Sequence, residues 1–169
     1  ALEAVEKSVP DVLVDGNAVC ATLADAQGRW SCVPSTALMP GMHTVTATAI
    51  DPAGNVSPQA MPHTFSIDTT APAVPVLVMP ADGSSTSAAR PPFSGTAEAG
   101  SVVTVFVDGQ PVCRATTDGA GAFACTAQVA LSLGQHRAHA IARDEAGNDS
   151  MSSNTNTFTI TGTAPGAPT

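Results

Sequence analysis

The 169-residue sequence has few basic residues, no tyrosine and no long apolar run. Lysine and arginine together number 6 against 14 acidic residues, so the net charge is −8. Because nucleic acids and anionic membrane surfaces both attract clustered basic side chains, we expect neither as a partner. No apolar segment approaches the roughly 20 residues that a membrane-spanning helix needs, which predicts no membrane insertion.

Helical patterning is also missing. Apolar residues nowhere recur at helical spacing over three turns, whereas Val, Thr and Ala dominate and Gly and Pro number 14 each. This composition is typical of short strands joined by turns. The sequence begins without Met or a signal peptide, which indicates a mature segment or an internal fragment.

The second half of the sequence repeats the first at a shift of 93 residues, without a gap. "VLVDGNAVC" (12–20) aligns with "VFVDGQPVC" (105–113), and "DPAGN" (51–55) aligns with "DEAGN" (144–148). We therefore predict one domain over residues 1–70, a second over 71–163, and a linker to a following domain over 164–169. The first copy has no counterpart of residues 74–95, so we expect it to lack its first strands.

The second copy shows period-two alternation and frequent turn signals, which predict an antiparallel β-sandwich. Its expected strands are Val74–Met79, Pro92–Thr96, Val102–Val107, Val112–Thr116, Ala122–Ala127, Gln135–Arg143 and Asn154–Ile160. Chain reversal at each turn then places three loops at one end of the sandwich: Ala97–Gly100, Asp118–Gly121 and Asp144–Asn148.

Several motifs together resemble a known family. "GTAEAGSVVTVFVDG", "DGAGAF", "ARDEAGN" and "DTTAP" look like the tandem bacterial immunoglobulin-like (Big-type) domains of large surface adhesins and other secreted proteins. Each motif alone is turn chemistry, and the specific signal is their order in both copies. The resemblance implies an all-β chain of two tandem immunoglobulin-like β-sandwiches, the first N-terminally incomplete. The cysteines depart from the usual pattern of that family.

Four cysteines form two equivalent pairs, Cys20 with Cys32 and Cys113 with Cys125, and each pair flanks a predicted turn. Each pair is symmetric about its turn, so the two sulfurs should face each other across a hairpin and form a disulfide. A metal site is the alternative, but the spacing fits none of the zinc patterns. Disulfides imply an oxidising compartment, which is extracellular or at the cell surface, with the periplasm as the alternative.

Calcium is the one candidate cofactor. Asp68 leaves the first copy toward the end of the second copy that carries Glu98, Asp144 and Asn148. Such a gathering of oxygen ligands suits Ca²⁺, and the resemblance supports it because several such adhesins carry calcium at domain junctions. The alternative is that Asp and Asn are there because they favour tight turns.

The sequence offers no catalytic constellation, since it has no GxSxG, no HExxH and no Gly-rich phosphate loop. His43 and His136 are equivalent, and we interpret them as surface residues that open a strand. Trp30 and Phe123 are also equivalent, and we expect both to be buried beside the cysteines.

We therefore predict a non-catalytic spacer of a bacterial cell-surface adhesin or secreted protein. It would support cell adhesion by projecting distal binding domains, and its partners would be neighbouring immunoglobulin-like repeats of the same chain. The alternative is a carbohydrate- or protein-binding accessory module of a secreted enzyme. Sugar-binding faces usually present aromatic side chains, of which this sequence has few.

Overall fold

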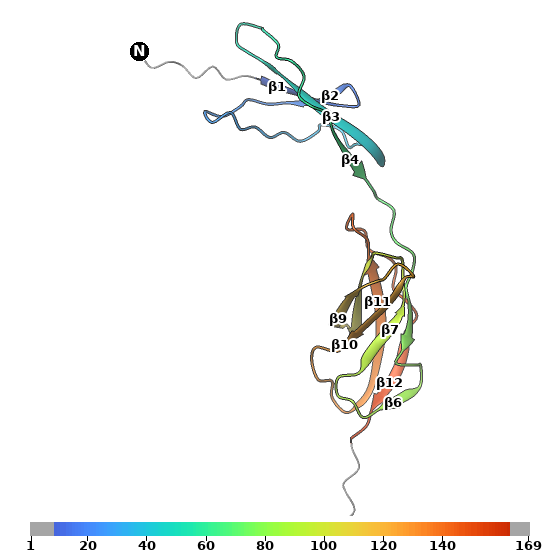
Figure 1. The fold of residues 1–169 in the computed structure, drawn as a ribbon. Coiled ribbons are helices and arrows are strands. Elements are labelled where there is room, and N and C mark those ends of the chain that lie inside the picture. The colour runs from blue at the N-terminus through green and yellow to red at the C-terminus, as the bar shows by residue number, and fades with distance from the viewer. Residues whose placement is uncertain (1–8, 163–169) are drawn as a thin grey trace, which may run out of the picture. The chain divides into compact units, whose positions relative to one another are not determined.

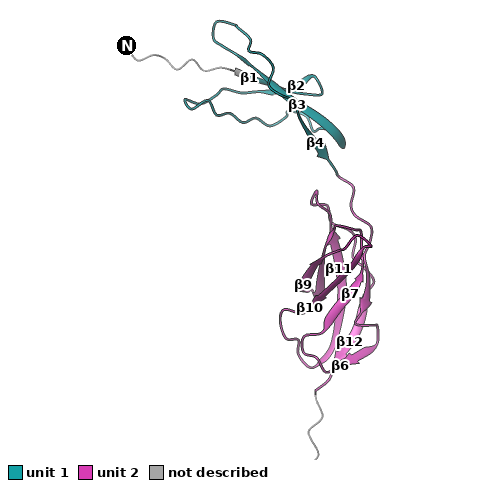
Figure 2. Ribbon diagram, in the orientation of Figure 1, with its two compact units in different colours: residues 1–68 teal, residues 69–169 magenta. Residues whose placement is uncertain are grey.

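The computed structural model describes residues 9–162, which form strands and turns without a helix (Figure 1). The chain divides into two compact units, residues 1–68 and residues 69–169, which we call unit 1 and unit 2 (Figure 2). The expected linker over residues 164–169 lies outside the described residues. Within residues 9–162, no helix is long and apolar enough to cross a membrane.

Unit 2 is a sandwich of two sheets. Its described strands are β5 (Val76–Met79), β6 (Ser84–Thr86), β7 (Pro92–Thr96), β8 (Val102–Val107), β9 (Gln110–Thr116), β10 (Ala122–Thr126), β11 (Gly134–Arg143) and β12 (Asn156–Ile160). One sheet has the order β10-β7-β5 and the other has the order β6-β12-β11-β8-β9. All neighbouring strands pair antiparallel except β6, which runs parallel to β12.

Alternating side chains build the core between these sheets. Val103, Val105 and Val107 of β8 are at most 2% exposed, and the residues between them are only partly buried. Three alanines of β11 and two large residues of β12 complete this face of the five-stranded sheet: Ala138, Ala140, Ala142, Phe158 and Ile160. Leu77 and Phe93 cover them from the three-stranded sheet. The alternation that the sequence predicts for these strands is confirmed.

Two features of unit 2 differ from the sequence-based expectation. Strand β6 was not predicted, because its sequence "SST" has no apolar alternation and only its pairing with β12 defines it. Strands β9 and β10 do not form a hairpin, because they belong to different sheets. The turn between them therefore carries the chain from one layer of the sandwich to the other.

Unit 1 contains one sheet among its described residues. Its strands are β1 (Val9–Val14), β2 (Asn17–Ala21), β3 (Gly41–Ile50) and β4 (His63–Ile67), in the order β2-β1-β3-β4. They are the counterparts of β8, β9, β11 and β12, at the shift of 93 residues. The counterpart of β10, residues 29–33, forms no strand. In unit 2 that strand pairs only with β7, which has no counterpart in the described part of unit 1.

Candidate functional site

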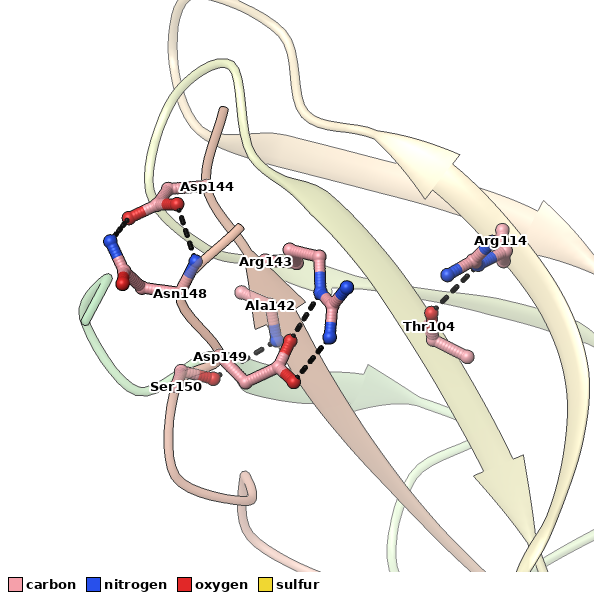
Figure 3. Close-up of polar contacts among 8 residues, drawn as sticks. All are labelled: Thr104, Arg114, Ala142, Arg143, Asp144, Asn148, Asp149 and Ser150. Atoms are coloured by element: carbon pink, nitrogen blue, oxygen red, sulfur yellow. Dashed lines mark hydrogen bonds and ion pairs between the residues drawn. The ribbon is translucent and has the colours of Figure 1, made fainter. Parts of the chain in front are cut away.

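The acidic loop Asp144–Asn148 follows β11 and is held together by its own side chains (Figure 3). The Asp144 carboxylate accepts hydrogen bonds from the Asn148 main-chain N–H at 2.8 Å and from its side-chain amide at 2.9 Å. Gly147 takes the positive φ of 96° that the tight turn requires. These bonds, led by the one from the Asn148 side chain, hold the pKa of Asp144 below its ordinary value.

The equivalent loop of unit 1 has the same geometry. Asp51 accepts hydrogen bonds from the main-chain and side-chain nitrogens of Asn55, both at 2.8 Å, and Gly54 has a φ of 89°. The side-chain bond from Asn55 is the first cause that lowers the pKa of Asp51. Inside the two units, this Asp and Asn therefore serve the turn in the same way.

Glu98 lies near Asp118 at the same end of unit 2. Its side-chain oxygen accepts a hydrogen bond of 3.2 Å from the main chain of Ala73, where the chain enters the unit. Its main-chain oxygen accepts bonds of 2.6 Å from the hydroxyls of Ser101 and Thr117, so the loop is tied to its neighbours. The Asp118 carboxylate accepts bonds from the main chain of the following turn.

The four residues expected to hold calcium are distributed over both units. Asp68 belongs to unit 1, whereas Glu98, Asp144 and Asn148 belong to unit 2. Among residues 9–162, no group of three or more His, Cys, Asp or Glu side chains could hold a metal ion. Inside unit 2, the carboxylates of Glu98 and Asp144 accept hydrogen bonds from neighbouring N–H groups. Calcium at the junction stays a prediction.

Both expected disulfides are present in the structure, Cys20–Cys32 and Cys113–Cys125. Their Cα atoms lie 6.1 Å and 6.0 Å apart. In unit 2 the bond connects β9 and β10, which are edge strands of different sheets. The expectation of a bond across a hairpin is thus wrong, because the bond links the two layers along one side of the sandwich.

A histidine–aspartate pair with a buried imidazole is a site that the sequence did not predict. His136 is 6% exposed, and its Nδ1 lies 2.7 Å from Asp108 while its Nε2 lies 2.8 Å from the carbonyl oxygen of Ser132. His43 makes the same two contacts with Asp15 and the carbonyl of Met39. The interpretation as a surface residue is therefore wrong for His136, whereas His43 is partly buried. The repetition of "VDG" and a Gly-x-His in both copies was the available signal.

The contacts of these histidines favour the charged imidazolium. A carboxylate and a carbonyl can only accept, so both ring nitrogens must carry a proton to satisfy them. Burial opposes the charge on His136, but its bonds with Asp108 and Ser132 outweigh burial and raise its pKa. The pKa of His43 is raised as well, first by the bond to Met39 and then by Asp15.

A shallow groove of about 410 Å³ lies on the outer face of the five-stranded sheet. It is lined by Thr104, Phe106, Pro111, Arg114, Ile141, Arg143 and Asp149. Figure 3 shows two of its arginines: Arg143 binds Asp149 through two nitrogens, at 2.7 Å and 2.6 Å, and Arg114 donates to Thr104 at 3.0 Å. Unit 1 has Ala21, Ile50 and Val56 at the positions of the three charged residues, so this groove is a feature of unit 2.

The family profile described as bacterial Ig-like domain matches residues 1–69 and 79–161. The chain belongs to this family. Bacterial Ig-like domains are typically non-catalytic modules, and the two matched segments fall on the two units. A comparison with curated protein sequences found no significant match.

One solved structure supports the fold of these bacterial Ig-like domains. The fibronectin(III)-like modules of Clostridium thermocellum CbhA are 14% identical, with a TM-score of 0.59, and the match covers 95% of this chain and 81% of theirs. At that identity the likeness shows the fold alone. The BSP domain of a biofilm associated protein is 21% identical, with a TM-score of 0.41, over 96% of this chain and 26% of that one.

The expected burial of Trp30 is wrong. Its side chain is 45% exposed, whereas the equivalent Phe123 is 4% exposed as predicted. Phe123 lies under β7, and no strand of that kind covers Trp30 within the described part of unit 1.

Proposed function

We propose that this chain is a spacer segment of a bacterial cell-surface adhesin or secreted protein, which carries mechanical tension and projects distal binding domains. Membership of the bacterial Ig-like family supports this coarse assignment. Neighbouring repeats of the same chain would be its partners. The two disulfides favour an extracellular or cell-surface location, since such bonds persist in oxidising compartments.

The observation that carries the proposal is the course of the chain through unit 2. The chain enters beside the loops of one end, where Ala73 binds Glu98. It leaves at the end of β12, where Ile160 lies opposite Gly134 at the start of β11. Entry and exit therefore lie at opposite ends of the sandwich, so tension on the chain acts along the strands (Figure 1).

The parallel pairing of β6 with β12 suits this direction of load. Tension draws β6 toward one end of unit 2 and β12 toward the other. The hydrogen bonds between the two segments are therefore loaded in shear together and cannot break one after another. Three of these hydrogen bonds run from Gly83 N–H to Thr157 O at 2.7 Å, from Thr157 N–H to the Asp82 carboxylate at 2.7 Å, and from Thr161 N–H to Thr86 O at 2.9 Å. The described part of unit 1 has no counterpart of β6.

Force spectroscopy on the oxidised chain, tethered at its two ends, tests this role. We expect unit 2 to unfold in one event. Asp82→Ala should lower the force of that event because it removes one sheared hydrogen bond, while Asp149→Ala, which lies outside the β6–β12 pair, should leave it unchanged. An unfolding force of unit 2 that Asp82→Ala does not lower would contradict this mechanical role.

Calcium at the junction between the units is part of the same proposal. Asp68, Glu98, Asp144 and Asn148 would supply carboxylate and amide oxygens, the ligands that Ca²⁺ prefers. The test is calorimetric titration of Ca²⁺ into demetallated chain, with Asp68→Ala as the matched variant. We expect heat of binding and a rise in melting temperature for the natural sequence only. An absence of both effects would remove calcium and leave the spacer role intact.

The groove on the outer face of unit 2 favours a second candidate, a binding module for a carbohydrate or a protein, which could serve a secreted enzyme as an accessory domain. Its arginines and Phe106 have no counterparts in unit 1, so turn chemistry and core packing do not account for them. Screening of the chain against glycans and acidic peptides, with Arg114→Ala as the variant, tests this candidate. Binding that the variant abolishes would support it, and no binding would leave the spacer role alone.

A further inference from the structure

The arginines of unit 2 gather on the outer face of its five-stranded sheet. Among Asp, Glu, Lys and Arg, only three residues lie in the described strands of this unit: Arg114, Arg137 and Arg143. On β11 the arginines alternate with the core alanines, so they point away from the core. The matching residues of unit 1 carry no charge: Ala21, Thr44 and Ile50. The fold therefore does not require these arginines, and a chain of net charge −8 carries one locally cationic face.

Two of these arginines line the groove of about 410 Å³ on this face. Arg143 belongs to β11 and Arg114 belongs to β9, and β8 lies between those two strands. The groove therefore has a basic residue on either side of β8. Its volume falls within the roughly 300–1,000 Å³ of small-molecule pockets, which bind their ligands through an apolar surface and a few polar groups.

The polar groups of the groove still have hydrogen-bonding capacity. Arg114 donates from Nε to Thr104 (Figure 3), and its two terminal nitrogens have no partner among residues 9–162. Asp149 accepts two bonds from Arg143, which hold its pKa below its ordinary value, so it is a carboxylate at neutral pH. A carboxylate has about four acceptor positions, so Asp149 can accept further bonds. The groove thus offers donors to an anionic group and an acceptor to hydroxyl groups.

An apolar surface lies beside these polar groups. Phe106 and Pro111 are opposite each other on β8 and β9, and Ile141 adds a third apolar side chain to the lining. The Phe106 ring stacks on the imidazole of His139, with the centroids 5.2 Å apart and the planes inclined by 7°, which fixes its orientation. The face of an aromatic ring carries partial negative charge, which suits the weakly positive C–H groups of a sugar ring. The groove therefore combines a surface for a sugar ring with polar groups beside it.

The position of β8 argues against a peptide as the ligand. This strand pairs with β11 on one side and with β9 on the other, so its main-chain groups are used within the sheet. An extended peptide binds by adding to an open strand edge, which the face of the sheet does not offer. A polyphosphate would satisfy Arg114, but it has no hydroxyl donors for Asp149 and would be repelled by that carboxylate. An acidic sugar has the three features that the groove selects, namely an anionic group, hydroxyl donors and an apolar ring face.

We propose that the groove binds an acidic saccharide that contains a hexuronate residue. The planar carboxylate of the sugar pairs with the two terminal nitrogens of Arg114, a geometry that guanidinium groups favour. The sugar hydroxyls donate to Asp149, and the C–H face of the ring packs on Phe106. This site rests on the second candidate function, the binding module, and gives that module a ligand class. The spacer role does not depend on it.

Calorimetric titration of the full chain at low ionic strength tests the proposal with matched tetrasaccharides. The acidic probes are built of galacturonate, glucuronate or mannuronate, and each has a neutral partner built of the corresponding hexose. We expect saturable binding of a uronate probe and binding of its neutral partner that is at least about tenfold weaker, as the loss of a charge-assisted hydrogen bond predicts.

Two arginine variants separate the groove from the general charge of the face. Arg114→Gln should weaken uronate binding by about tenfold, because it removes the charged partner of the sugar carboxylate. Arg137→Gln is the matched control, since Arg137 lies on the same face but does not line the groove. It should leave the affinity unchanged.

Nuclear magnetic resonance locates the bound sugar. Binding should shift the signals of Phe106 and Ile141 and leave that of Thr159, on β12 outside the groove, unchanged. The proposal is overturned if no uronate probe binds at millimolar concentration, if the neutral probes bind equally well, or if Arg137→Gln weakens binding as much as Arg114→Gln. A glutamate-rich peptide that shifts Phe106 where no uronate does would overturn it and keep the binding module. If neither sugars nor peptide bind, the module is removed as well and the spacer role stands alone.

Discussion

At the scale of single residues, aspartates at equivalent positions of the two units build the hairpin turns of this protein. Asp15 and Asp108 take positive φ angles of 51° and 49° and are each followed by a glycine, as a tight hairpin turn requires. Each carboxylate also binds a main-chain N–H and a histidine of the neighbouring strand. One side chain thus fixes both the turn and the start of the next strand.

The Asp108–His136 pair predicts how the stability of unit 2 depends on pH. Because the folded pKa of His136 lies above its unfolded value near 6.5, the charged form contributes stability that is complete below pH 6.5. That contribution is lost as the pH rises through the folded pKa. Urea unfolding of the chain should therefore show a lower midpoint for unit 2 at pH 9 than at pH 6.

Asp108→Asn tests the cause of this dependence. The amide oxygen can still accept from the Arg137 N–H, but the negative charge beside His136 is gone. The pKa of His136, followed by nuclear magnetic resonance, should fall, and the difference in stability between pH 6 and pH 9 should shrink. Asp118→Asn, at the other end of unit 2, is the control and should leave both quantities unchanged. A His136 pKa that does not move would contradict the assignment.

At the scale of elements, the close approach of β7 to β5 and β10 depends on one glycine. A Cβ at Gly95 would lie 2.0 Å from the carbonyl oxygen of Val76 and 2.8 Å from the ring of Phe123. Both sheet neighbours of β7 would have to move. Gly95→Ala should therefore destabilise unit 2 by about 3 kcal/mol, the upper part of the range for overpacked cores.

Gly119→Ala is the matched control, since Gly119 has no positive φ and no atom within 4 Å of an added Cβ. It should change the free energy of unfolding by less than about 0.5 kcal/mol. Urea titration followed by far-ultraviolet circular dichroism measures both variants. Equal effects at the two positions would show that the packing of β7 is not limited by Gly95.

The disulfide of unit 2 should also stabilise the unit as a link between its layers. Cys113 and Cys125 are 12 residues apart, and closing such a loop contributes about 3 kcal/mol on the chain-entropy account. We expect the double variant Cys113→Ala, Cys125→Ala to lower the free energy of unfolding of unit 2 by about that amount. The control, Cys20→Ala with Cys32→Ala, should leave the free energy of unfolding of unit 2 unchanged. A shift of the unit 2 unfolding transition in this control would contradict the prediction.

The strands also show which parts of the fold could be predicted from the sequence. The sequence predicted the alternation of buried and exposed residues along β8, β11 and β12, because each strand has one buried face. It also predicted the pairing of the cysteines, because each pair is placed symmetrically about a turn. The sequence could not predict that the chain changes sheets between β9 and β10, because a turn such as Asp118–Gly121 suits a hairpin and a crossover equally well. The His136 pair was missed because its partner, Asp108, is 28 residues away, and only the fold brings the two together.

At the scale of the whole molecule, two copies of one sequence pattern have different amounts of core among residues 9–162. Unit 2 buries a continuous cluster between two sheets, whereas the described part of unit 1 has one sheet with a partly exposed inner face. Because the burial of apolar surface is the main source of folding free energy, the units should differ in stability. Equilibrium unfolding of the chain is then not a two-state process.

The single tryptophan allows this difference to be measured in the intact chain. Trp30 lies in unit 1, so its emission reports that unit, while circular dichroism reports the strands of both. We expect the fluorescence midpoint in urea to lie below the main circular dichroism midpoint. Gly95→Ala should move the circular dichroism transition and leave the fluorescence transition in place. Coincident midpoints that move together would mean that the two units unfold as one.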